Sequence, residues 1–308
     1  MEDESNKPNS SISPLDRALI EGRQPLRCIV KLGGAAITRK NELESIDEES
    51  LRSACAQLRE AMGSSGGNAS PAKVLGMDWS RGTGELTVSS AIDELREHLG
   101  MDLGNNFIVV HGAGSFGHFQ ASRSGVHKGG LHLPLVKAGF VATRISVTSL
   151  NLEIVRALAR EGIPSVGMSP FACGWSTQQR NIASADASQI IHSLHAGFVP
   201  TDVLGVYDRP PTDLNAVLIR EIVVDEDGNW SIVRPALTHN SKKVAITVAA
   251  HDTTGGMETK ISEAAMIAKL GIDVYIAKVG TEYSLRALKG QVRENPEDWL
   301  GTIIRSSK

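Results

Sequence analysis

Three short glycine-bearing segments carry residue types that suit the binding of phosphate groups: KLGG at 31–34, HGAGSFGH at 111–118 and TGGM at 254–257. Glycine lets backbone N–H groups approach phosphate oxygens closely, and a helix that follows adds its positive N-terminal end. Any one of these loops is more simply read as a tight turn. Three of them together, two with a lysine nearby, favour phosphate chemistry. None has the spacing of a Walker A loop or of a dinucleotide-binding GxGxxG fingerprint.

The segments that flank these loops predict how they are positioned. An apolar run at 27–32 precedes the first loop, and a continuous apolar run at 107–110, typical of a strand buried on both faces, precedes the second. A helix predicted over 258–270 follows the third. In an open α/β sheet, ligands bind beyond the carboxyl ends of the strands. We therefore expect the loops to share one edge of a sheet.

The rest of the chain alternates between the two types of element, which predicts an α/β fold with a largely parallel sheet. Inward-facing positions of the longest helix are predicted at Val136, Phe140, Ile145, Leu150, Ile154 and Leu158. Apolar spacing predicts helices at 47–62, 86–99, 135–161 (the longest) and 184–195, and Ser184 is expected to cap the last one. Strands are predicted at 163–168 and 273–279. A hairpin is predicted over 217–233, with its turn at Asp227-Gly228. A mobile polar arm is expected at 1–26 and a loop at 63–84.

Composition excludes several classes of protein. The 308 residues are 41% hydrophobic, enough for a sizeable core, and the net charge of −3 argues against nucleic-acid binding through bulk charge. No apolar run approaches the roughly 20 residues of a membrane span. The three cysteines lie far apart and show no zinc-ligand spacing. The acidic, polar N-terminus lacks a signal-peptide core, so we expect a cytoplasmic protein.

Four motifs together resemble the amino acid kinase superfamily, and within it the isopentenyl phosphate kinase branch. They are KLGG, HGAGSFGH, TDVLGVYD at 201–208 and GGMETK at 255–260, and the second histidine of HGAGSFGH is the discriminating feature. The resemblance implies an open, largely parallel central sheet sandwiched by helices. It also implies ATP-dependent phosphorylation of isopentenyl phosphate to isopentenyl diphosphate, with Mg²⁺. A homodimer is implied, and neither nucleic acid nor membrane is expected as a partner.

The same resemblance implies roles for particular residues. Lys31 would lie along the transferred phosphate, Lys40 would stabilise the transition state, and His118 would donate a hydrogen bond to the acceptor phosphate. Ala113 and His118 are the expected substrate-binding residues. The expected nucleotide-binding residues are Lys31, Gly33, Gly34, Gly114, Asp202, Tyr207, Gly256 and Lys260. No protein ligand to a metal is expected, and His111 is interpreted as structural.

One junction departs from the family pattern. The segment ending in Phe198-Val199-Pro200 runs directly into Thr201, although both flanks resemble pieces of a parallel sheet. Joining parallel strands takes a crossover of about 30 residues or more. In the family, this region supplies an aspartate that orients the catalytic lysines, and nothing in the spacing supports Asp186 or Asp202 as its substitute. The sequence therefore predicts a fold that lacks one crossover unit and exposes neighbouring apolar surface.

Residues 27–308 are predicted to form a single domain, with an acceptor and phosphate-binding half at 27–200 and a nucleotide-binding half at 201–308. Two alternative functions remain open. The chain could be a catalytically impaired isoform that acts only as a binding or subunit partner. It could also be another small-acid kinase of the superfamily, which would need a carboxylate-recognising arginine such as Arg123 or Arg144.

Overall fold

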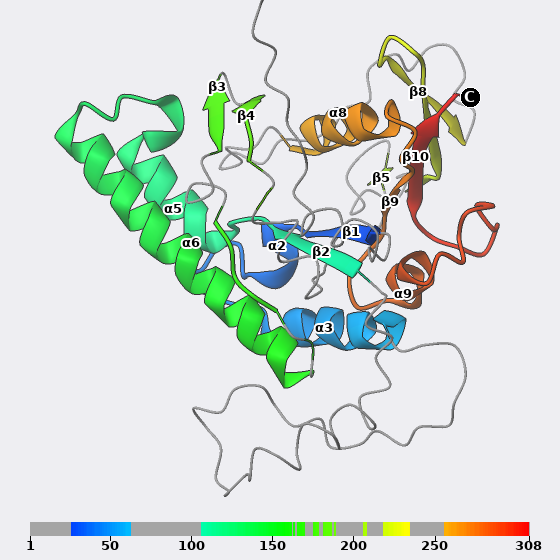
Figure 1. Ribbon diagram of the computed structural model, residues 1–308, viewed down its shortest axis with the longest axis horizontal. Helices are drawn as coiled ribbons and strands as arrows, with labels where there is room; N and C mark the ends of the chain where they lie inside the picture. Colours follow the sequence, from blue (N-terminus) through cyan, green and yellow to red (C-terminus); the bar gives the residue numbers. More distant parts are fainter. Residues whose placement is uncertain are drawn as a thin grey trace, which may run out of the picture.

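The computed structural model (Figure 1) describes residues 26–62, 106–161, 163, 165–169, 175–178, 181–186, 188, 206–207, 218–234 and 256–307. The predicted arm at 1–26, apart from its last residue, the predicted loop at 63–84 and the predicted helix at 86–99 lie outside these ranges. The α/β class predicted from the sequence is confirmed, because parallel strands and helices alternate along the chain.

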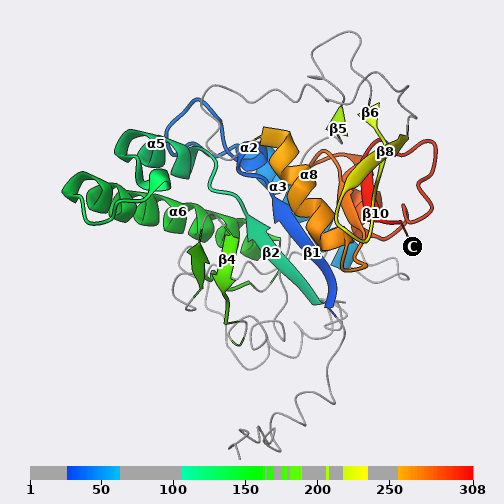
Figure 2. The same ribbon diagram turned by 90° about the horizontal axis from the view of Figure 1, so that it is seen from above.

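Two parallel strands, β1 (Leu26–Leu32) and β2 (Asn106–His111), position the first two glycine loops. Their register pairs Lys31 with Val110 and Leu32 with His111, so both strands end at the same edge. The backbone N–H of Gly112 extends the pairing by donating to the carbonyl of Leu32 at 2.7 Å. Both loops therefore leave the sheet side by side, as Figure 2 shows.

Helices surround this strand pair. Their bounds are α2 (Gly34–Ile37), α3 (Glu48–Met62), α5 (Ser115–Ser124), the 3-10 turn η2 (Val126–Lys128) and α6 (Pro134–Arg160). The apolar spacing of α3 works as predicted, because Leu51, Ala54, Cys55, Leu58 and Met62 are all buried. They share a core with Leu32 and Phe107 from the strands and Leu150, Ile154 and Leu158 from α6. None of the described helices has both the length and the apolar character needed to cross a membrane.

A second sheet, in the order β8-β7-β10-β9, lies in the C-terminal half. Its strands are β7 (Glu221–Val224), β8 (Trp230–Arg234), β9 (Val274–Ile276) and β10 (Thr302–Ser306). The predicted hairpin is confirmed: β7 and β8 are antiparallel, and Gly228 takes φ of 90° in the turn between them. Strand β10 runs parallel to β7 and antiparallel to β9.

Two helices belong to this half, α8 (Gly256–Ala268) and α9 (Glu282–Leu288). The buried face of α8 packs on the sheet through Ile261, Ala264, Ala265 and Ala268, which share a core with Ile222, Val224 and Ile304. Helix α9 lies against α3, where Gln57 donates from Nε2 to the carbonyl of Thr281 at 2.7 Å. This contact joins the two halves of the chain.

Two antiparallel pairs complete the described strands. One joins β3 (Ser176–Gln178) to β4 (Asn181–Ser184), and the other joins β5 (Val206–Tyr207) to β6 (Leu218–Ile219). Neither pair was predicted from the sequence. Both use strands of two to four residues, which are too short for a readable alternation of apolar and polar side chains.

Several sequence predictions were wrong. No strand forms among residues 163 and 165–169, and Ser184 ends β4 instead of capping a helix. Most of the predicted helix at 184–195 lies outside the described residues. Ile145, predicted to face inward, is 65% exposed, because it lies off the buried stripe of α6 that includes Val136, Gly139, Ser146 and Leu150. The run at 107–110 is not buried on both faces, since Val110 is 44% exposed.

We expect Leu58→Ala to lower the free energy of unfolding by about 2–5 kcal/mol, because it removes a side chain that is 1% exposed and leaves a cavity between α3 and the strands. Urea denaturation monitored by circular dichroism measures the change. Leu43→Ala, at a position 50% exposed, is the control and should cost far less. Equal losses in the two variants would contradict the assigned core.

Candidate active site

The two glycine loops that leave β1 and β2 pack backbone against backbone. A Cβ atom on Gly34 would lie 2.1 Å from the nitrogen of Gly114, and one on Gly112 would lie 2.6 Å from the nitrogen of Gly34. Gly114 also has φ of +50°, where a side chain is strained. Only glycine satisfies these positions, so the loops form a backbone-lined surface at the ends of the strands. Such a surface can approach phosphate oxygens closely.

A buried junction of hydroxyl groups fastens the two loops together. Thr38, which follows α2, donates from Oγ1 to the carbonyl of Gly34 at 2.7 Å. The same oxygen accepts a hydrogen bond from the backbone N–H of Ser115 at 3.0 Å. Thr38 and Ser115 are 3% and 0% exposed, so breaking either bond would leave a buried polar group unpaired.

The segment 39–45 carries Lys40 and is tied to the start of α5. Arg39 donates its backbone N–H to the carbonyl of Ser45 at 2.9 Å, which closes the segment into a loop. The Ser115 hydroxyl accepts from the Ser45 N–H at 3.3 Å and donates to the Ser45 carbonyl at 3.2 Å. The side chain of Lys40 is exposed.

His118 lies in the first turn of α5, directly after the second glycine loop. Its backbone N–H donates to the carbonyl of Gly114 at 3.2 Å, and its residue is half-buried. Gly117 makes room for this turn, since a Cβ atom there would lie 2.5 Å from Cβ of Ala113. The second glycine loop thus leads from Ala113 directly into the helical turn that carries His118.

Lys31 and Lys260 come from different halves of the chain. Lys31 ends β1, and its Nζ lies 3.6 Å from Oε2 of Glu263, which lies on α8 three residues after Lys260. The ion pair brings α8 beside β1, in agreement with Figure 2. Gly256 begins α8, and Lys260 in its second turn is half-buried. Residues 254 and 255 of the third glycine-bearing segment lie outside the described residues.

Of the remaining residues named in the sequence analysis, the structure describes some in full, some as backbone alone and some not at all. Gly33 caps α2 and lies in the first glycine loop. Asp202 lies outside the described residues, and Tyr207 is described only as backbone in β5. Asp186 is exposed and its carboxylate is held by Ser188, which lowers the pKa of Asp186 through hydrogen bonds.

Sequence reasoning missed Thr38, Ser115 and Glu263, whose roles depend on contacts between distant parts of the chain. It kept His111 as structural, and the contacts of this residue agree. Asn151 donates from Nδ2 to Nε2 of His111 at 3.0 Å, which leaves the proton on Nδ1, 3.3 Å from the carbonyl of Gly112. Burial lowers the pKa of His111, partly offset by that carbonyl. The neutral ring therefore supports the loop instead of carrying charge.

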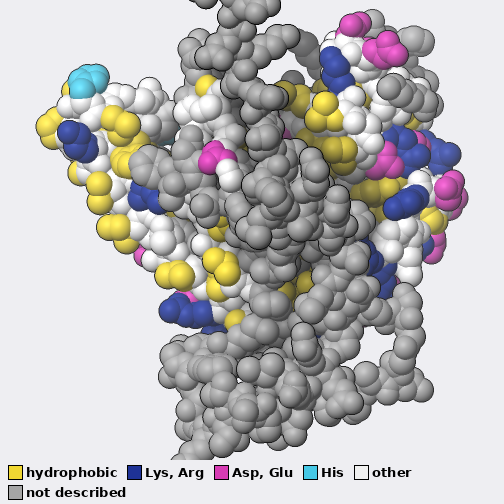
Figure 3. All heavy atoms as spheres, in the orientation of Figure 1, with side chains coloured by type: hydrophobic (Ala, Val, Ile, Leu, Met, Phe, Trp, Pro, Cys, Tyr) yellow, Lys and Arg dark blue, Asp and Glu magenta, His cyan; other side chains and the backbone are white. Residues whose placement is uncertain are grey.

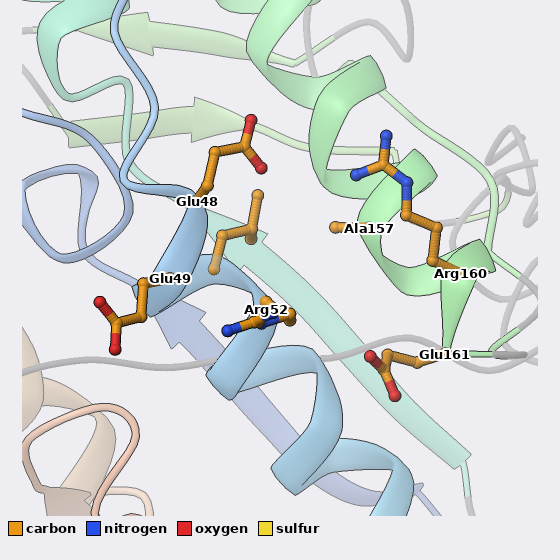
Figure 4. Close-up of a pocket in the computed structure, with 7 residues that line it drawn as sticks. Glu48, Glu49, Arg52, Ala157, Arg160 and Glu161 are labelled. Carbon is orange, nitrogen blue, oxygen red and sulfur yellow. The ribbon is translucent and has the colours of Figure 1, made fainter.

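A cavity of about 570 Å³ opens between the first turn of α3 and the last turn of α6 (Figure 4). Its lining is mostly charged: Glu48, Glu49, Leu51, Arg52, Ala157, Arg160 and Glu161. No residue predicted for the active site takes part in it. Within the described ranges, no group of three or more carboxylate, histidine or cysteine side chains could hold a metal ion.

Comparison with known proteins places these features in context. The profile of the amino acid kinase family matches residues 26–200 and 201–278, which is most of the chain. An isopentenyl phosphate kinase of Arabidopsis thaliana is 57% identical over 324 residues, covering 92% of this chain and 96% of the relative. An isopentenyl phosphate kinase of Methanothermobacter thermautotrophicus is 27% identical over 308 residues, covering 85% of this chain and 95% of the relative.

Solved structures show the same fold. X-ray structures of an isopentenyl phosphate kinase match with a TM-score of 0.58 at 24% identity, over 90% of this chain and 99% of theirs. A crystal structure of an isopentenyl phosphate kinase substrate complex matches with a TM-score of 0.52 at 17% identity, over 91% of this chain and all of the other.

The lowered pKa of His111 predicts a pH dependence of stability. The unfolded chain takes up a proton near the ordinary pKa of 6.5, whereas the folded chain does so only at lower pH. Acid therefore favours the unfolded state. The contribution of His111 to the free energy of unfolding is fully present above pH 6.5 and is lost as the pH falls below that value. Denaturant unfolding between pH 5 and 8 should show a steeper loss for the wild type than for His111→Gln. Parallel curves would refute this assignment.

We expect Gly34→Ala to force the two glycine loops apart, because its new methyl group would overlap the backbone of Gly114. The free energy of unfolding should fall by about 1–3 kcal/mol, as overpacking does elsewhere. Ala35→Ser adds one atom at the next, exposed position and is the matched control. Urea denaturation of both variants measures the effect, and an unchanged Gly34→Ala protein would contradict the close contact.

Proposed function

The chain belongs to the amino acid kinase family, and from this premise we propose that it transfers the γ-phosphoryl group of ATP to isopentenyl phosphate, forming isopentenyl diphosphate and ADP. The curated relatives named isopentenyl phosphate kinase, matched over nearly their whole length, support this substrate. The observation that carries the proposal is the contact between the glycine loops. It sets Lys31, at the end of β1, and His118, at the start of α5, beside one backbone-lined surface.

In the proposed reaction, an oxygen of the acceptor phosphate attacks the γ-phosphorus while the bond to the β–γ bridging oxygen breaks. The protein contributes position and positive charge. Lys31, Lys40 and Lys260 would neutralise charge on the transferred group and the nucleotide, and His118 would donate a hydrogen bond to the acceptor phosphate. The glycine loops, with Ala113 and Gly114, would offer backbone access on either side.

Mg²⁺ fits this scheme as an ion carried by the nucleotide. The described residues offer no cluster of carboxylates that could form a metal cage. Mg²⁺ usually keeps several waters and binds substrate phosphates with few protein ligands. When bound, the ion would neutralise charge between the β- and γ-phosphates, leaving the lysines to act on the transferred group.

We also propose a cytoplasmic homodimer, with an acceptor half at 27–200 and a nucleotide half at 201–308. Support for the dimer comes from apolar side chains exposed along α6, which Figure 3 shows at one edge of the molecule. Val141, Ile145 and Leu152 are 52%, 65% and 48% exposed. Their spacing of 4 and 7 residues fits one stripe of a helix, where a second copy could pack.

We also propose that this chain lacks one crossover unit of the fold, at the junction of Pro200 and Thr201. The family match is divided between Pro200 and Thr201, where the sequence predicts the gap. The alignment with the Arabidopsis relative spans 324 residues, more than the 308 of this chain, so that relative carries residues with no counterpart here. Ile29 on β1 and Val110 on β2 are 59% and 44% exposed, as expected for strands that lack a neighbouring layer.

The test is a coupled ADP-release assay with ATP, Mg²⁺ and isopentenyl phosphate. We expect turnover by the wild type and a loss of about 100-fold or more in kcat for Lys40→Ala and His118→Ala, because each removes a group that stabilises developing charge. Arg39→Ala removes the neighbouring exposed cation, whose guanidinium lies 3.6 Å from Glu42, and should keep most activity.

Other outcomes would contradict the proposal in distinct ways. A folded protein without turnover, tested beside the active Arabidopsis relative, would favour the catalytically impaired isoform. Turnover of an amino acid or another carboxylate, without turnover of isopentenyl phosphate, would favour another small-acid kinase of the family. Equal losses in Arg39→Ala and Lys40→Ala would remove the special role of Lys40.

A further inference from the structure

The carboxylate of Glu263 faces the lysine expected to act on the transferred phosphate. Its Oε2 lies 3.6 Å from Nζ of Lys31, and the pair joins β1 to α8. Resting on the proposed function, we propose that Glu263 is a positioning residue, which holds the Lys31 ammonium group toward the helix that carries Lys260. Neither the family resemblance nor the comparisons assign this role.

Both ends of the ion pair come from well-fixed backbone. Lys31 precedes Leu32, which is fully buried and paired with His111 across the sheet. Glu263 follows Ile261 and precedes Ala264, two buried residues that anchor α8 on the second core. Only the side chains of the pair are free to move. The carboxylate therefore defines where a flexible four-carbon lysine side chain places its charge.

Exposure decides what kind of effect the pair can have. The side chains of Lys31 and Glu263 are 57% and 58% exposed, so water and salt screen their attraction and the pair adds little stability. An ammonium group has three donors, and a single contact with Glu263 leaves others for phosphate oxygens. The pair can therefore restrict the orientation of Lys31 without blocking its use.

Glu263 also occupies a favourable place on α8. It lies three residues after Lys260, and residues three apart are neighbours on a helix surface. One carboxylate thus faces Lys31 and lies about one helical turn from Lys260. In the family this organising charge is expected from an aspartate of the crossover region, which the sequence lacks. In this chain, a carboxylate on α8 supplies it.

The test compares Glu263→Gln with the wild type in the ADP-release assay. We expect kcat to fall about tenfold, as expected when a reacting group is less well aligned, and KM for ATP to fall by about two- to threefold, because removing a negative charge favours phosphate binding. Glu263→Asp keeps the charge and should restore part of kcat. Glu153→Gln breaks another exposed ion pair, with Arg156 on α6, and should leave kcat unchanged.

A cycle with Lys31→Ala separates this inference from the proposed function. If Glu263 acts through Lys31, Glu263→Gln should change ATP affinity, measured by calorimetry, by about two- to threefold with Lys31 present and leave it unchanged in Lys31→Ala. This binding cycle needs no turnover, so an inactive wild type would sink the proposed activity and still test the pair. Equal changes in both backgrounds, or a lower kcat that Glu263→Asp does not raise, would overturn the role of Glu263.

Discussion

The contact between the backbones of Gly34 and Gly114 is the constraint on which the site depends. With a side chain at either position, the loops after β1 and β2 could not lie against each other. This contact brings Thr38 within reach of the Ser115 N–H, and Ser115 in turn ties down the segment that carries Lys40. Glycine at these positions is thus required by packing, and the exposed backbone suited to phosphate is a consequence of that packing.

Charge is distributed along the chain in a way that suits anionic substrates. From residue 106 to 152, which includes the second glycine loop, α5 and most of α6, the sequence contains no aspartate or glutamate. Two arginines and two lysines, Arg123, Arg144, Lys128 and Lys137, lie in this stretch. This local excess of positive charge stands against a net charge of −3 for the whole chain, and Glu44, from the segment 39–45, brings a carboxylate to α5 by accepting a hydrogen bond from Gln120.

The sequence predicts what depends on local pattern. The helical spacing of Leu51, Cys55 and Leu58 and the turn at Asp227-Gly228 were predicted correctly, and the first two glycine loops follow parallel strands as expected. Ile145 was misplaced because the inward position of that turn belongs to the polar Ser146, which is 1% exposed and which an apolar pattern does not mark. Thr38 and Ser115 are 77 residues apart, and Lys31 and Glu263 meet only through the packing of two halves. Such pairs leave no signal in local spacing.

The arrangement of the two halves bears on whether a shortened chain can still assemble its site. The contact between Gly34 and Gly114 and the hydrogen bond from Gln120 on α5 to Ser146 on α6 both join residues that precede residue 200. These contacts do not need the proposed missing unit. The halves are joined elsewhere, between α3 and α9, where Ser284 donates to Oε1 of Gln57 at 2.7 Å and Lys289 reaches Glu60. Helix α9 follows β9 in the chain. Strand β9 pairs with β10, and α8 packs on β10. The path that connects α8, and with it Glu263, to the first half therefore runs through α3 and the C-terminal sheet, so the proposed loss at Pro200-Thr201 leaves these contacts in place.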